Sequence, residues 1–123
     1  MNINSPIDIH KHLNTRIFLD QEHLICFSIQ AHRSLITQHL VHIGTETHLL
    51  VDLQKLFLTP ILVKADSIII AHNHPNGVVY PSQADIETTL RIKKTGKLLN
   101  IPLLDHIIFT KELFYSFSEN NLI

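Results

Sequence analysis

The stretch AHNHPNGVVYPSQAD, residues 71–85, gathers side chains that could bind a metal ion. His72 and His74 are two positions apart, so in an extended backbone their imidazoles lie on the same side of the chain. Asp85 follows in the expected first turn of a helix, facing back towards the end of the strand. Two imidazoles and one carboxylate would leave the fourth position of a tetrahedral zinc ion open to water, as in catalytic sites. The alternative is a polar turn that caps a helix.

A catalytic zinc site also needs a base and a hydrogen-bond donor. Bound zinc lowers the pKa of its water to about 7, but another group must accept the proton and pass it to the leaving group. The stretch contains no glutamate, and Glu22, at the start of an expected strand, is our candidate for this base. The alternative for Glu22 is a solvated residue at a strand start. Ser82, three residues before Asp85, is placed to donate a hydrogen bond to the developing oxyanion.

The composition predicts one ordinary globular domain over residues 1–123, because 45% of the residues are hydrophobic and the length suits one domain. The formal net charge of −1 gives no reason to expect a polyanionic partner. The one cysteine, Cys26, excludes an internal disulfide and is expected in the core. There is neither a secretory signal nor an apolar run long enough to span a membrane, so we expect a cytoplasmic protein without membrane contact.

The spacing of apolar residues predicts the elements that position these side chains. The expected order is a helix at 5–14 capped by Ser5, strands at 22–30 and 34–44 around a turn, a helix at 51–66, a strand at 67–72, a helix at 83–100, and strands at 102–110 and 113–117. Pro60 is expected to kink or split the second helix. This order predicts an α/β layered domain with a mixed sheet.

Two helices should each bury an apolar side. On the second helix the expected core residues are Leu53, Leu56, Phe57, Ile61 and Val63. On the third helix they are Ile86, Leu90, Leu98 and Leu99.

The motif as a whole resembles a known family. His-x-His-Pro, then six residues, then Ser-x-x-Asp, with a glutamate upstream, resembles the JAMM motif of the JAB/MPN metalloprotease superfamily. AHNHPNG is similar to the RadC branch, which has HNHPSG followed by PSxxD, with Asn76 in place of its serine. The likeness continues through EHLICFSIQAHRSLI and KLLNIPLLDHIIF and covers about residues 16–119, with a short helix before this core.

The resemblance implies a fold and a set of roles. The fold is a cytidine-deaminase-like α/β/α sandwich with a mixed central sheet. The implied site holds one Zn²⁺ per chain on His72, His74 and Asp85, with Glu22 shuttling the proton and Ser82 stabilising the oxyanion. The implied activity is that of a zinc-dependent hydrolase, resembling a metallopeptidase or isopeptidase, in which zinc-bound water attacks an amide carbonyl of a peptide or isopeptide substrate. Deaminase activity is poorly supported, because it needs His-x-Glu and Pro-Cys-x-x-Cys and the chain has only Cys26.

A second hypothesis comes from the name of the branch, which ties it to DNA repair. The chain would then be a non-catalytic accessory or interaction module of DNA metabolism that retains a structural metal. A basic stretch after the motif bears on this alternative, and it consists of Arg91, Lys93, Lys94 and Lys97. Its ordinary interpretation is a solvated helix face, since the chain lacks net positive charge and nearby aromatic residues. An unpaired edge strand would also allow a homodimer.

Further polar residues keep more than one interpretation. Asp105 and His106 could support the metal ligands, form a surface pair or join a hydrogen-bond network at a strand end. His39 and His42 are expected at the surface, with a second metal site or a pH-sensitive patch as the alternative. The other histidines expected at the surface include His10, His12, His23, His32 and His48.

Overall fold

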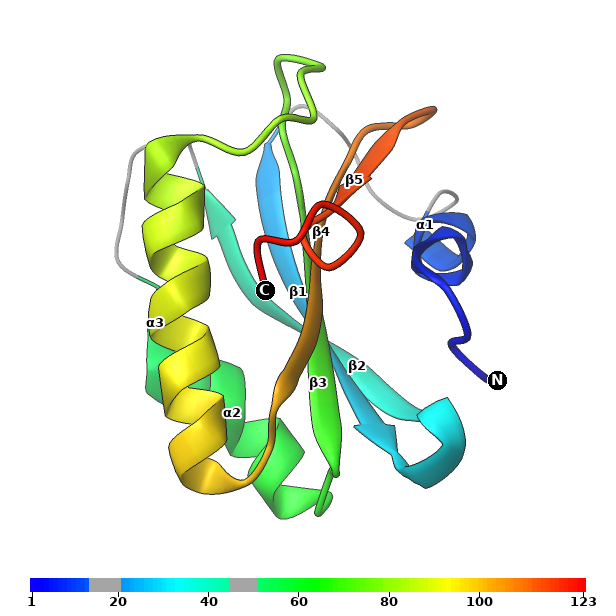
Figure 1. Cartoon of the computed structure of the whole chain (residues 1–123), viewed down its shortest axis with the longest axis vertical. Helices are drawn as coiled ribbons and strands as arrows, with labels where there is room; N and C mark the ends of the chain where they lie inside the picture. Colours follow the sequence, from blue (N-terminus) through cyan, green and yellow to red (C-terminus); the bar gives the residue numbers. More distant parts are fainter. Residues whose placement is uncertain (14–20, 45–50) are drawn as a thin grey trace.

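The chain folds into three layers, with a sheet between helices (Figure 1). The computed structural model describes residues 1–13, 21–44 and 51–123. One helix lies on one face of the sheet, and the other two cover the opposite face. These helices are α1 (Pro6–Leu13) on the first face and α2 (Leu53–Leu62) and α3 (Gln83–Leu99) on the second.

The sheet has five strands in the order β2-β1-β3-β4-β5. Their bounds are β1 (Glu22–Gln30), β2 (Ser34–Gly44), β3 (Ser67–Asn73), β4 (Leu103–Phe109) and β5 (Phe114–Ser116). A 3-10 turn, η1 (Ala31–Arg33), joins β1 to β2. The pair β3–β4 is parallel and the other pairs are antiparallel, so the sheet is mixed. The predicted α/β sandwich with a mixed central sheet is confirmed.

The two faces of the sheet build two separate cores. Along β1, Leu24 and Cys26 pack towards α2 and α3, whereas Ile25 and Phe27 pack towards α1. This alternation follows from the period of two in a strand. Because both faces are covered, β1 is apolar from Leu24 to Ile29 except at Ser28. Cys26 is fully buried, so its predicted core position is confirmed, and this burial raises the pKa of its thiol to about 12.

Of the two effects predicted for Pro60, a kink or a split of the second helix, the split is wrong. α2 is one helix that begins after Asp52, whose side chain accepts a hydrogen bond from the Lys55 backbone N–H. It ends two residues beyond Pro60, where the N–H groups of Lys64 and Ala65 bond to carbonyls of the last turn. Pro60 lies so near the end of the helix that its missing N–H removes little of the ladder.

The expected core faces of the helices are partly wrong. On α2, Leu56 and Phe57 are buried as predicted, but Ile61 is exposed. On α3 the leucines expected in the core are exposed, and Ile86 is half-buried. The exposed leucines of α3 are Leu90, Leu98 and Leu99. The buried residues of α3 are instead Thr89, Ile92 and Gly96.

The geometry of α3 explains this error. Positions 85, 89, 92 and 96 share one face of a helix, and this face carries Asp85 to the end of β3. The inward face of α3 therefore combines one apolar residue, Ile92, with polar and small residues. At Gly96 an added Cβ would lie 2.5 Å from the Ile101 carbonyl oxygen, so a larger side chain would keep α3 from its place on the sheet.

His10 is also not where the sequence places it. The side chain is buried at 8% exposure, and its Nε2 lies 2.9 Å from the Thr110 carbonyl oxygen. Its ring packs against Phe114. His48 lies outside the described residues. Among the helices of residues 1–13, 21–44 and 51–123, none combines the length and the apolar character that a membrane span requires.

Candidate metal centre

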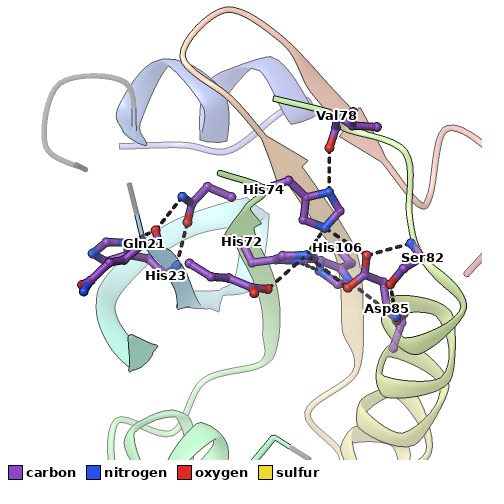
Figure 2. Close-up of polar contacts among 11 residues, drawn as sticks. Gln21, His23, His72, His74, Val78, Ser82, Asp85 and His106 are labelled. Atoms are coloured by element: carbon purple, nitrogen blue, oxygen red, sulfur yellow. Dashed lines mark hydrogen bonds and ion pairs between the residues drawn. The ribbon is translucent and has the colours of Figure 1, made fainter. Parts of the chain in front are cut away.

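His72, His74 and Asp85 meet where the central strand ends and α3 begins (Figure 2). His72 is the sixth residue of β3 and is buried, and His74 follows directly after the strand. The Nε2 atoms of the two histidines lie 3.0 Å apart. The Asp85 carboxylate lies 3.3 Å from Nε2 of His72 and 3.0 Å from Nε2 of His74. The sequence-predicted ligands therefore come together as one group.

The chemistry of these atoms fits a bound cation. His74 Nδ1 lies 2.6 Å from the Val78 carbonyl oxygen, which can only accept, so Nδ1 donates and Nε2 of the neutral ring carries a lone pair. That lone pair faces an Asp85 carboxylate oxygen at 3.0 Å, and two electron-rich atoms repel at this distance. A proton or a metal ion between them removes the repulsion. Imidazole nitrogen and carboxylate oxygen are ligands that zinc accepts.

The electrostatics of the metal-free group agree with this interpretation. Burial opposes the charge of both side chains, but their mutual hydrogen bond and attraction outweigh it. The pKa of His74 is therefore raised, and the pKa of Asp85 is held well below its usual range. Asp85 is therefore ionised over the ordinary pH range, and the raised pKa of His74 favours a proton at the place of the cation when no metal is bound.

Ser82 builds the start of α3. Its hydroxyl oxygen accepts a hydrogen bond from the Asp85 backbone N–H at 3.0 Å, and its own N–H donates to the Asp85 carboxylate at 2.8 Å. This reciprocal capping box fixes the rotamer of Asp85. The helix cap and the ligand set are thus not alternatives, because one carboxylate belongs to both. The Ser82 hydroxyl hydrogen is not needed for the cap and is free to donate elsewhere.

Glu22 reaches the same group from β1. Its carboxylate oxygen lies 3.8 Å from Nε2 of His72. The antiparallel register pairs Leu24 with His72, so Glu22, two residues earlier, projects from the same face of the sheet. The upstream glutamate and the loop, about fifty residues apart in the chain, are neighbours because β1 and β3 are paired.

Asn73 holds Glu22 in place, a role that the sequence interpretation missed. Its side chain points to the opposite face from His72 and is fully buried there. Its amide oxygen accepts from the His23 backbone N–H at 2.6 Å, and its amide nitrogen donates to the Gln21 carbonyl at 2.8 Å (Figure 2). One side chain therefore fixes the backbone on both sides of Glu22. The signal in the sequence is the amide between the two histidines, which can donate and accept at once.

His106 lies behind His72, whereas Asp105 does not reach the site. The His106 ring is buried, its Nε2 lies 2.6 Å from Nδ1 of His72, and burial holds its pKa well below the ordinary value. The Asp105 carboxylate accepts hydrogen bonds from Ser116 and from the backbone N–H of Ser118, and it joins β4 to the C-terminal turn. Of the interpretations left open, support of a ligand holds for His106 and a strand-end network for Asp105.

A cavity of about 250 Å³ opens in front of this group. Glu22 and the three ligands line it together with apolar and aromatic side chains that include Val51, Val78 and Tyr80. A substrate chain could therefore approach the site along a partly apolar wall.

The other candidate residues lie apart from this group. His39 is half-buried, with Nε2 3.3 Å from the Lys55 carbonyl, and His42 lines the cavity. Neither belongs to a group of three or more metal-binding side chains in the described part of the chain. Arg91 donates to the Val51 carbonyl at 3.0 Å. The exposed members of the basic stretch are Lys93, Lys94 and Lys97.

A mixed sheet between helices, with two histidines and an aspartate at the end of its central strand, defines a JAB/MPN-type domain. The family model for the RadC-like JAB domain matches residues 3–122, and the chain belongs to this family. It is 36% identical to a UPF0758 protein of Chlorobaculum parvum over 99% of the chain and 57% of the relative. It is 38% identical to a UPF0758 protein of Bacillus licheniformis over 86% of the chain and 47% of the relative. It is 37% identical to a UPF0758 protein of Staphylococcus aureus over 95% of the chain and 52% of the relative. The chain thus spans about half the length of these relatives.

Proposed function

We propose that this domain is a zinc-dependent hydrolase that cleaves amide bonds, as a metallopeptidase or isopeptidase. The observation that carries the proposal is the convergence of the His72, His74 and Asp85 ligand atoms within 4.8 Å, with a Glu22 carboxylate oxygen 3.8 Å from one of them. A purely structural site would be closed by a fourth protein ligand. Here the group opens into a cavity, and a carboxylate lies beside it.

The side chains divide the work of hydrolysis among them. Zinc held by the three ligands would supply a water molecule that loses a proton near neutral pH. Glu22 would accept that proton at its carboxylate oxygen and deliver it to the leaving nitrogen of the amide. Ser82, whose hydroxyl hydrogen the helix cap leaves free, would donate a hydrogen bond to the carbonyl oxygen as negative charge develops there.

Metal analysis and one isosteric substitution test the proposal. Protein purified without added metal should contain close to one zinc per chain by mass spectrometry, and His74→Ala should lose it. With a panel of peptide and isopeptide substrates, Glu22→Gln should lower turnover by about 100-fold or more, the range for a general base, with its zinc retained. Glu87→Gln is the matched control, since Glu87 is exposed on α3 and contacts Gln83. Equal turnover of Glu22→Gln and the wild type would overturn the assignment of the base.

The alternative, an accessory module that contacts DNA, rests on the exposed Lys93, Lys94 and Lys97 of α3. Glu22→Gln would leave such binding intact, whereas reversing the three lysine charges would weaken it. If no substrate in the panel is cleaved and only the lysine variant loses a measured DNA affinity, the accessory role replaces the hydrolase.

A further inference from the structure

The Thr89 hydroxyl makes two short contacts that its one hydrogen cannot serve equally. Its oxygen lies 2.7 Å from the Asp85 carbonyl oxygen and 2.6 Å from Nδ1 of His106. A carbonyl oxygen can only accept, so the hydroxyl hydrogen lies between Thr89 and Asp85. Otherwise two oxygen atoms would face each other at 2.7 Å without a hydrogen between them. The hydroxyl oxygen is therefore the acceptor of the second contact, and His106 Nδ1 carries a hydrogen.

The position of this hydrogen determines the rest of the chain of contacts. His106 is 1% exposed and its ring nitrogens contact Thr89 and His72, so the buried ring is neutral and has one N–H. With the hydrogen on Nδ1, its Nε2 can only accept. His72 Nδ1, 2.6 Å away, must then be the donor, and the lone pair of His72 is on Nε2. That Nε2 faces His74 and Asp85.

We propose that Thr89 and His106 are positioning residues that hold His72 in the Nδ1–H tautomer, the form whose Nε2 can bind a metal ion. The inference rests on the metal site of the proposed function and deepens it. This chain of hydrogen bonds, called the relay below, begins at the backbone carbonyl of one ligand residue, Asp85. It runs through Thr89 and His106 and ends on the ring of another ligand, His72. The Phe117 ring stacks on His106 with centroids 4.5 Å apart and planes at 13°, which fixes the plane of the relay.

Removing the Thr89 hydroxyl reverses the relay. Without an acceptor at Nδ1, His106 can move its hydrogen to Nε2 and donate it to Nδ1 of His72. The hydrogen of His72 then occupies Nε2, where it points at the other ligands and covers the lone pair. Thr89→Val has this effect with almost unchanged side-chain volume, whereas Thr89→Ser keeps the hydroxyl and is the matched control.

Nitrogen-15 NMR of the imidazoles reads the tautomers directly and does not depend on activity or on bound metal. In metal-free wild type at about pH 8.5, above the ordinary imidazole range, His72 and His106 should both show the Nδ1–H pattern. Spectra of His72→Gln and His106→Gln assign the two rings. Thr89→Val should move both rings towards the Nε2–H pattern, and Thr89→Ser should not. An Nε2–H pattern for either ring in the wild type would overturn the inference without involving any variant.

Zinc affinity, measured by competition with a chromogenic chelator, gives the second result. Thr89→Val should bind zinc about 10-fold more weakly than the wild type, the lower end of the range for removing such a partner, and Thr89→Ser should bind like the wild type. Equal affinity of Thr89→Val and the wild type would overturn the relay and leave the metal site standing. Equal binding by His74→Ala and the wild type would instead refute the metal site, while the NMR result would still decide the tautomers.

Discussion

Asn73 offers a test of how the fold positions Glu22, because its side chain makes the two hydrogen bonds that hold the backbone on either side of Glu22. Asn73→Ala removes the 2.6 Å bond from the His23 N–H and the 2.8 Å bond to the Gln21 carbonyl. The Asn73 side chain is fully buried, so water does not readily replace it. Each hydrogen bond contributes about 0.5–1.5 kcal/mol and both end on partly buried backbone groups, so the loss of the two should lower the free energy of unfolding by about 1–3 kcal/mol. This is a large part of the ~5–15 kcal/mol of a typical domain.

The same substitution should separate turnover from metal binding. Glu22 lies between the two anchored residues, so loss of the anchors lets its carboxylate leave the position 3.8 Å from His72. Neither contact involves a metal-binding atom, and zinc content should stay that of the wild type. Turnover should fall by about 10-fold or more, since a misplaced base loses much of the ~100-fold or greater effect of a positioned one.

Urea unfolding in excess chelator measures the change in the free energy of unfolding without the contribution of bound metal. Asn120→Ala is the control, because it removes one hydrogen bond, to the Ser116 carbonyl, at an exposed residue. Asn120→Ala should lower the free energy of unfolding by about 1 kcal/mol or less. If the free energy of unfolding of Asn73→Ala lies within about 0.5 kcal/mol of the wild-type value, the two Asn73 hydrogen bonds do not hold the backbone around Glu22 as argued. An Asn73→Ala protein that loses its zinc would show that Asn73 acts through the ligands instead.

Two further predictions concern stability. Gly96→Ala should lower the free energy of unfolding by about 1–3 kcal/mol in urea titrations, because its Cβ would lie 2.5 Å from the Ile101 carbonyl oxygen, and a loss below about 0.5 kcal/mol would contradict the close packing of α3. The raised pKa of His74 sets a pH dependence in metal-free protein. The contribution of protonated His74 to the free energy of unfolding is complete below the unfolded-state pKa of about 6.5. It is lost as the pH rises through the higher folded-state pKa. The difference in unfolding free energy between the wild type and His74→Ala should therefore shrink as the pH rises above about 6.5, and a difference that grows with pH would refute the assignment.

The ligand positions were predictable because they depend on local rules. The alternation of a strand places His72 and His74 on one side, and a serine three residues before Asp85 marks the first turn of a helix. The order of strands and helices was predictable for the same reason, since each element has its own apolar period. The fold class follows from that order.

The support of the ligands was not predictable, because it depends on register and on the rotation of a helix. His106 reaches His72 only in the parallel pairing of β3 with β4, which no local pattern specifies. Thr89 reaches His106 only because α3 turns the face that carries Asp85 and Thr89 inward. Apolar periodicity favoured a different face, with Leu90 in the core, since a hydrophobic pattern gives no weight to a buried threonine.

The contacts that hold the three ligands bear on whether a metal here is catalytic or structural. Each ligand is fixed through an atom or oxygen lone pair other than the one it offers to a metal: His72 through His106, His74 through the Val78 carbonyl, and Asp85 through the Ser82 backbone N–H. A structural zinc typically organises loops that cannot fold without it, so its binding energy is used in folding. Here the orientation comes from a central strand, a capped helix and buried partners, which the two cores already hold in place. Because the site is oriented without a metal, a metal bound here is not required for folding, and this favours the hydrolase over a metal kept for structure.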